Sequence, residues 1–180
     1  MALYRGKYIL PDLDKITPEM EKDLDLAYDI CEAYREEFPC EMCGRCCHQA
    51  NIIVRPEEVE RVAAAGQVPL YDFMTQWVYR TEDGRILFNK EPDAPCRFLG
   101  KDRKCTIWQD RPEICDDFPY LVSMFMSRVY LAIVNPQVDI LRMIAYMDDT
   151  WPCTREIKAS IVDRVAAARK QRAARLSAGA

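Results

Sequence analysis

Four cysteines within eight residues are the strongest chemical signal in the sequence. Cys40, Cys43, Cys46 and Cys47 form a C-x2-C-x2-C-C run. A two-residue spacing allows a tight loop to direct two thiolates at one metal centre, and Gly44 can adopt a positive φ angle without steric cost. The run therefore predicts a metal or metal-cluster site. Adjacent side chains on an extended backbone point apart, so we expect either Cys46 or Cys47 to face a different side or a second centre.

Three more cysteines lie in short motifs further along the chain, each beside an apolar residue. The motifs are Pro-Cys-x-Phe-Leu around Cys96, Cys-x-Ile-Trp from Cys105, and Arg-Pro-x-x-Cys ending at Cys115. Bacterial ferredoxins share the C-x2-C-x2-C start of the first run, but their fourth cysteine is separated by three further residues and precedes a proline. The sequence therefore does not describe a ferredoxin.

These motifs, in this order, resemble the YkgJ-like cysteine-cluster family, also described as CxxCxxCC or zinc- and iron-chelating proteins. The resemblance covers residues 38–119. It implies a metal or cluster held by Cys40, Cys43, Cys46, Cys47, Cys96, Cys105 and Cys115. The family includes shorter proteins of unknown activity and longer lysine N-methylases of flagellin, and this chain lacks the length of the methylases. It also has Asp116 and Asp117 after the last cysteine, where the family pattern predicts a basic residue.

The identity of the metal depends on the donor set. Zinc and iron–sulfur clusters both accept thiolates, and spacing does not choose between them. Seven cysteines exceed the four needed for one tetrahedral zinc or one [4Fe–4S] cluster, and the chain has a single histidine. We expect an iron–sulfur cluster, with zinc as the alternative. His48 is expected to hydrogen-bond beside the centre rather than to ligate it. Arg111 could donate to a cluster sulfur, although a salt bridge is the commoner role of such an arginine.

Two cysteines lie outside the family pattern. Cys31 falls on the apolar side of a predicted helix with Tyr34, so we expect a packed thiol and not a ligand. Cys153 follows Pro152 at the start of the predicted C-terminal helix, where the helix dipole favours a thiolate. It is expected to be either an eighth ligand, sufficient for two four-cysteine centres, or a half-buried thiol beside Trp151.

Hydrophobic periodicity predicts a mainly α fold with minor β structure and long irregular cysteine-rich loops. The expected helices are Thr17 to Phe38, Pro56 to Ala65, Tyr71 to Tyr79, Val138 to Met147, and Thr154 to Leu176. Residues 82–85 predict a turn into a strand over 86–88, and residues 129–134 fit either a strand or a helix. Thr17 and Pro18 are a helix-start signal.

The segment from Lys90 to Pro119 is rich in Pro, Asp, Gly and Cys and has no periodicity. We therefore expect irregular backbone there, held by the metal instead of a conventional core. Residues 1–180 are predicted to form one small domain built around this site. Its family-like core is 38–119, and helices over 17–38 and 154–176 flank it.

Composition restricts the class of protein. A net charge of -4 with 49% hydrophobic and 30% charged residues is typical of a soluble globular protein and argues against nucleic-acid binding. The sequence shows neither a secretory signal nor an apolar stretch near the roughly 20 residues of a membrane helix, so we expect no membrane insertion. We expect a cytoplasmic protein with reduced thiols. The basic stretch 169–175 predicts a solvated helix end, and the acidic pairs at 116–117 and 148–149 predict solvated carboxylates or helix caps.

Motifs for common catalytic sites are missing from the sequence, including a Ser-His-Asp order, a phosphate-binding glycine loop and the H-E-x-x-H pattern. We therefore expect a cluster-binding protein that transfers electrons, or an accessory to a redox or cofactor-assembly system, acting with a protein partner. One alternative is a structural zinc site in a protein-interaction module. Another is an enzyme, for example one like the lysine N-methylases, in which a cluster with an open iron position binds substrate.

Overall fold

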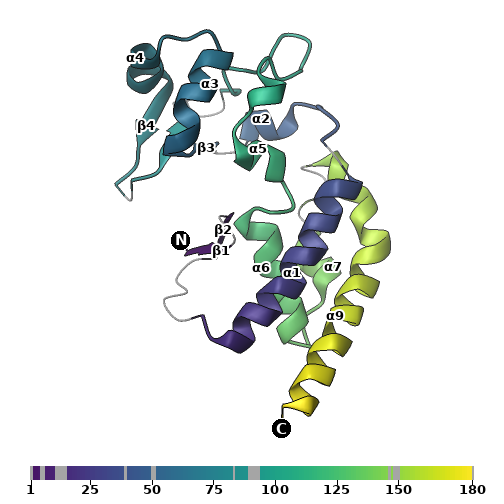
Figure 1. The fold of residues 1–180 in the computed structure, drawn as a ribbon. Coiled ribbons are helices and arrows are strands. Elements are labelled where there is room, and N and C mark those ends of the chain that lie inside the picture. The colour runs from purple at the N-terminus through teal and green to yellow at the C-terminus, as the bar shows by residue number, and fades with distance from the viewer. Residues whose placement is uncertain are drawn as a thin grey trace. The chain divides into compact units, whose positions relative to one another are not determined.

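The computed structural model describes residues 2–4, 7–10, 16–38, 40–49, 52–82, 84–88, 94–145, 147 and 151–179. These residues are predominantly helical with few strands (Figure 1), which confirms the predicted fold class. The chain divides into a helical unit, Met1–Pro39 with Asp117–Ala180, and a cysteine unit, Cys40–Asp116. All seven cysteines of the family pattern belong to the cysteine unit, whereas Cys31 and Cys153 belong to the helical unit. That residues 1–180 form one domain stays a prediction.

The helical unit packs long helices side by side (Figure 1). Its elements are strands β1 (Ala2–Tyr4) and β2 (Lys7–Leu10), helices α1 (Pro18–Glu37), α6 (Ser123–Val134) and α7 (Ile140–Ile144), the 3₁₀ helix η4 (Pro152–Ile157) and helix α9 (Lys158–Ala178). The stretch 129–134, left open between strand and helix, is part of α6. Among the described residues, none of the helices is both long and apolar enough to cross a membrane.

Helix α1 begins where its capping residues predict. The Thr17 hydroxyl accepts a hydrogen bond from the Met20 N–H at 3.2 Å, and Pro18 occupies the first turn. Cys31 lies fully buried on the inner side of this helix beside Tyr34, which confirms that it is a packed thiol of the helical unit. The Tyr34 hydroxyl lies 2.8 Å from Ser160 Oγ and so ties α1 to α9.

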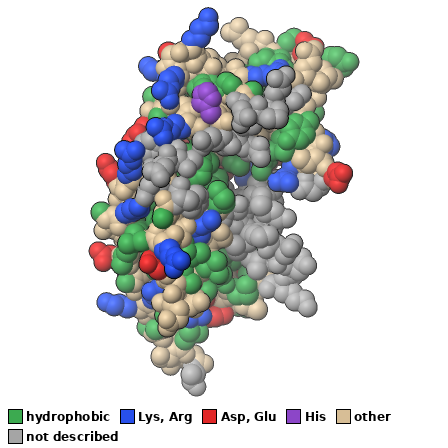
Figure 2. Space-filling view, turned by 180° about the vertical axis from the view of Figure 1, so that it is seen from behind, with side chains coloured by type: hydrophobic (Ala, Val, Ile, Leu, Met, Phe, Trp, Pro, Cys, Tyr) green, Lys and Arg blue, Asp and Glu red, His purple; other side chains and the backbone are tan. Residues whose placement is uncertain are grey.

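Helix α9 carries the predicted apolar stripe, with Ile161, Val165 and Ala168 buried. Its basic residues are structural: Arg172 Nε donates to the buried Asp23 carboxylate of α1 at 2.9 Å, and Arg169 Nε donates to the Ala132 carbonyl at 2.8 Å. On the face seen in Figure 2, Lys and Arg side chains are dispersed among acidic and apolar ones. The basic tail therefore stabilises helix packing within its own unit.

The cysteine unit combines short helices with a small antiparallel sheet of strand order β3-β5-β4. Its elements are α2 (Arg45–Gln49), β3 (Ile53–Val54), the 3₁₀ helix η1 (Pro56–Glu58), α3 (Val59–Ala65), α4 (Leu70–Asp72), the π-helix η2 (Phe73–Trp77), β4 (Val78–Arg80), β5 (Ile86–Phe88), the 3₁₀ helix η3 (Trp108–Asp110) and α5 (Glu113–Asp117). The helix predicted from Pro56 and the strand predicted at 86–88 are both present.

Three predicted helices differ from the observed ones. The helix expected over Tyr71 to Tyr79 ends at Trp77, because Val78 and Tyr79 pair with Phe88 and Leu87 of β5 across a hairpin. Of the helix expected from Val138 to Met147, α7 is the regular part. The C-terminal helix begins with a 3₁₀ segment before α9. Sheet pairing and local tightening of the first turn override the periodic pattern at these ends.

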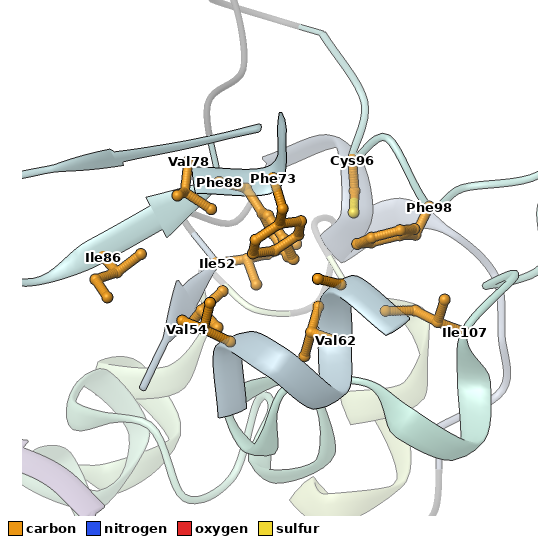
Figure 3. Packing of buried hydrophobic residues seen from close by; sticks show 12 residues of the cluster. Ile52, Val54, Val62, Phe73, Val78, Ile86, Phe88, Cys96, Phe98 and Ile107 are labelled. Carbon is orange, nitrogen blue, oxygen red and sulfur yellow. The ribbon is translucent and has the colours of Figure 1, made fainter. Parts of the chain in front are cut away.

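A conventional hydrophobic core holds the cysteine unit, contrary to the expectation that metal replaces it over Lys90 to Pro119. Phe98 and Ile107 are buried in one cluster with Val62, Phe73 and Phe88, as Figure 3 shows. Phe98 meets the Phe88 ring edge-on at 5.5 Å and the Trp77 ring at 5.0 Å. Residues 90–93 of that prediction lie outside the described residues. The cysteine segments are therefore anchored by packed aromatic side chains before any metal binds.

Candidate metal centre

The loop that begins the C-x2-C-x2-C-C run is a tight turn with two left-handed residues. Met42 has φ 50° and Gly44 has φ 74°. The Met42 N–H donates to Cys40 Sγ at 3.3 Å, which folds the loop back on its first thiol. A Cβ atom at Gly44 would lie 3.3 Å from the Arg103 carbonyl oxygen and 3.3 Å from a Leu99 methyl group. Glycine therefore allows this loop to approach the 99–105 segment closely.

Cys46 and Cys47 lie on the short helix α2, not on an extended backbone. The extended backbone expected for this pair is therefore wrong, whereas a second centre for one of the two thiols stays a prediction. The side chains of Cys46 and Cys47 lie within hydrogen-bonding reach of each other. A hydrogen bond between them, with burial, raises the pKa of the Cys46 thiol. The two sulfurs therefore form an adjacent pair.

Backbone hydrogen bonds join the second cysteine segment to the first. The Cys96 N–H donates to the Cys47 carbonyl at 2.7 Å, so these two residues lie side by side. The segment then turns back, with a bridge between Leu99 and Cys105 and a bond from the Thr106 N–H to the Phe98 carbonyl at 2.8 Å. Cys96 points its sulfur into the buried cluster next to Phe98 (Figure 3). Packing of Phe98 thus positions both Cys96 and Cys105.

A buried carboxylate positions the third segment, and the motifs did not single it out. Glu58 accepts a hydrogen bond from the Glu113 N–H at 2.7 Å, at the start of α5, which carries Cys115. It also accepts from the Arg55 N–H at 2.9 Å and from Arg61 Nη2 at 3.1 Å, while only 7% exposed. The sequence signal is a capping box. Arg55 precedes the turn that begins at Pro56, and Glu58 stands three residues after Arg55.

We expect Glu58→Ala to destabilise the cysteine unit by about 2–4 kcal/mol, because the substitution leaves two partly buried backbone N–H groups and the Arg61 side chain without their acceptor. Glu58→Gln keeps an acceptor oxygen and is expected to lose about half as much, through loss of charge-assisted bonding. Urea unfolding of the metal-free, reduced protein measures both changes. Glu57→Ala, an exposed neighbour, is the matched control and is expected to leave stability within about 0.5 kcal/mol. Equal stability of the Glu58→Ala and Glu57→Ala proteins would show that Glu58 has no such role.

The seven cysteines are coupled electrostatically within the cysteine unit. Burial raises the pKa of Cys115 well above its ordinary value, and the neighbouring thiols Cys96, Cys47 and Cys105 raise it further. Burial likewise raises the pKa of Cys40, to which Cys43 and Cys47 add. Every cysteine of the family pattern therefore has at least one other within electrostatic reach.

The donor chemistry fits a thiophilic metal, because the side chains gathered here are soft sulfur atoms. Among the described residues, no group of three ligating side chains is placed closely enough to hold a metal ion. None of the nine cysteines forms a disulfide, and their exposure ranges from the exposed Cys40 to the buried Cys96. His48 is exposed at the end of α2. The arrangement is a reduced thiol network whose ligand set stays a prediction.

Cys153 lies in the helical unit, in η4, with Pro152 in the first turn as predicted. It is half-buried, and its carbonyl accepts a hydrogen bond from the Tyr120 hydroxyl at 2.9 Å. Its role as an eighth ligand stays a prediction.

Arg111 is held in place at the edge of the thiol network. Its Nη1 donates to the Trp108 carbonyl at 2.6 Å, its guanidinium stacks on the Trp108 ring at 3.8 Å, and its Nη2 pairs with Asp116. The predicted salt bridge is therefore present. Asp116 takes the place of the expected basic residue and is exposed as predicted, whereas Asp117 is buried, contrary to the prediction of a solvated carboxylate. The pair at 148–149 lies outside the described residues.

Comparisons with known proteins agree with this geometry. The family model CxxCxxCC, described as "putative zinc- or iron-chelating domain", matches residues 39–138, more than half of the chain. A protein of Methanocaldococcus jannaschii named "Uncharacterized protein MJ0661" is 30% identical over 95 residues, which cover 52% of this chain. The chain thus spans about half, 50%, of that relative's length. No solved structure matches. The motifs, the thiol network and the family match together place the chain in the CxxCxxCC family of zinc- or iron-chelating domains.

Proposed function

We propose that the cysteine unit holds an iron–sulfur cluster, of the [4Fe–4S] type, with ligands drawn from its seven thiols. The chain then acts in electron transfer, or as an accessory to a redox or cofactor-assembly system, with a protein partner. The observation that supports this most directly is the gathering of Cys40, Cys43, Cys46, Cys47, Cys96, Cys105 and Cys115 in one unit as free thiols. When bound, such a cluster would supply a one-electron redox couple.

The character of the donors favours iron–sulfur over a mixed zinc site. Thiolates are the ligands of Fe–S clusters and of all-cysteine zinc sites, whereas imidazole would widen the choice to other metals. The single histidine, His48, is exposed at the end of α2. A cytoplasmic location, which keeps thiols reduced, suits nine free cysteines.

The placement of Cys40 supports exchange of electrons with a partner. Its side chain is exposed, while Cys96 and Cys115 extend the network into the core. The exposed Cys40 and the buried Cys96 would hold such a cluster between the solvent and the core. Shielding of the cluster from water changes its reduction potential, and a ligand near the surface shortens the distance over which an electron passes to a protein partner.

Anaerobic purification followed by metal and sulfide analysis tests the proposal. We expect iron and acid-labile sulfide in about equal amounts and a broad brown absorbance near ~400 nm that bleaches on reduction. Colourless protein with stoichiometric zinc would instead assign the structural zinc alternative. Protein with neither metal, even after reconstitution under reducing conditions, would overturn both assignments.

A further inference from the structure

The Nε atom of Arg111 takes part neither in the salt bridge to Asp116 nor in the hydrogen bond to the Trp108 carbonyl. This atom is buried, and it has no hydrogen-bond partner among the described residues. The rest of the guanidinium is committed to Trp108 and Asp116, and the side chain is only 18% exposed. A buried N–H without an acceptor costs free energy, so such a group in a folded protein points to an acceptor that arrives later.

Thiols of the cysteine unit lie within electrostatic reach of Arg111. Arg111 lies four residues before Cys115, joined to it through a turn in which the Cys115 N–H donates to the Pro112 carbonyl at 2.8 Å. Burial raises the pKa of Cys40, Cys105 and Cys115, and the positive charge of Arg111 opposes the rise at all three. Three segments of the thiol network therefore meet around one cation.

Arg111 is also fixed in orientation. The Arg61 side chain donates to its carbonyl at 3.3 Å, and Arg61 in turn is held by the buried Glu58. The ring of Trp108 supports the flat face of the guanidinium. The Arg111 guanidinium is therefore held through its backbone carbonyl, its flat face and its Nη atoms. It can donate its remaining Nε–H with little loss of conformational entropy.

We propose that Arg111 is a positioning residue of the metal centre, whose Nε–H donates to a metal-bound cysteine sulfur in the loaded protein. This inference rests on the proposed metal-binding function. The thiolates of a loaded centre carry net negative charge inside a partly buried site, and a charge-assisted N–H···S bond offsets it. The bond also withdraws electron density from the sulfur, which raises the energy of sulfur-to-metal charge transfer.

Titration of the reduced, metal-free protein with Co²⁺ tests the inference, because cobalt thiolates show intense sulfur-to-metal charge-transfer bands. The variants are Arg111→Met, which removes charge and donors, and Arg111→Lys, which keeps the charge but lacks the Nε–H. Arg97→Met is the matched control: Arg97 follows Cys96 and stacks on Trp77 at 5.2 Å, but it does not contribute to the thiol pKa shifts.

We expect Arg111→Met to weaken Co²⁺ binding by roughly 10- to 100-fold, the usual effect of removing a partner of a metal ligand, and to move the charge-transfer band to lower energy. Arg111→Lys is expected to bind better than Arg111→Met but to show the same band shift. Arg97→Met should match the wild type. A purely structural role would leave the band of the bound fraction in place.

The outcomes separate this inference from the proposed function. If both Arg111 variants bind Co²⁺ with the affinity and the charge-transfer band of the wild type, the proposed role of Arg111 is overturned. The proposal that the protein binds metal then remains intact. A wild-type protein without any charge-transfer band would overturn both. Circular dichroism of each variant before titration identifies an unfolded variant, and the band position of Arg111→Lys then decides the result.

Discussion

Replacing Cys115 with alanine is expected to strip most of the metal from the protein, whereas replacing Cys31 with alanine is expected to leave metal content unchanged. Cys115 is partly buried in the cysteine unit within electrostatic reach of Cys96, Cys47 and Cys105. A structural four-thiolate site is worth about 10–16 kcal/mol, so loss of one ligand is expected to weaken binding by ~100-fold or more. Cys43→Ala, Cys96→Ala and Cys105→Ala are expected to behave like Cys115→Ala.

Cys31 is the matched control because it is also shielded from solvent but belongs to the helical unit, whereas Cys115 is partly buried in the cysteine unit. Cys31→Ala should cost only packing, on the order of 1 kcal/mol, since a small buried group is lost. Metal-to-protein ratios after anaerobic purification measure the whole set. Cys153→Ser in the same set decides between an eighth ligand and a packed thiol. A Cys31→Ala protein as poor in metal as Cys115→Ala would contradict the division of the cysteines between the two units.

Much of the helical architecture could be predicted because local signals and packing agree. Thr17 and Pro18 begin α1 in sequence and in structure, and Cys31 lies on the buried stripe that its spacing predicts. The stripe of Ile161 and Val165 was equally readable. Where local sequence signals and packing disagree, packing determines the structure. Val78 belongs to a helical pattern, but pairing with Phe88 makes it a strand residue.

The cysteine segments show what spacing alone could not reveal. The motifs identified the thiols, and all of the family pattern falls in one unit. Short helices such as α2 have no periodicity to read, so the backbone conformation of Cys46 and Cys47 was predicted wrongly. The anchoring of Cys96 and Cys105 depends on Phe98, whose partners Phe73 and Phe88 come from helix η2 and strand β5. Such nonlocal aromatic packing leaves no regular pattern in one sequence.

The stability of the metal-free protein is expected to fall above pH 9, and metal binding is expected to remove the part of that fall that the ligand thiols cause. The ordinary pKa of a cysteine thiol is 9.0, and burial together with neighbouring thiols raises the pKa of Cys105 and Cys115 in the folded protein. At pH values between the ordinary and the raised pKa, the unfolded chain has lost the protons of these thiols, whereas the folded chain still holds them. The free energy of unfolding therefore decreases as pH rises, by up to about 1.4 kcal/mol per pH unit for each such thiol.

Metal reverses the sign of this dependence. Thiolates on a metal have already released their protons. Above pH 9 the folded and the unfolded chain therefore hold the same number of protons at these residues, and the free energy of unfolding no longer falls there. Lowering the pH instead destabilises the loaded protein, because protons compete with the metal for sulfur. Urea unfolding at pH 7, 8, 9 and 10, with and without metal, under reducing and anaerobic conditions, measures both slopes.

Cys31 supplies the internal control for this measurement. Burial raises its pKa as well, but it lies in the helical unit, so Cys31→Ala should reduce the alkaline slope equally in the loaded and metal-free proteins. Cys115→Ser should reduce the slope of the metal-free protein and also abolish the difference that metal makes. Parallel pH profiles of the loaded and metal-free wild type would show that the buried thiols are not the metal ligands, because only ligation removes their protons before unfolding does.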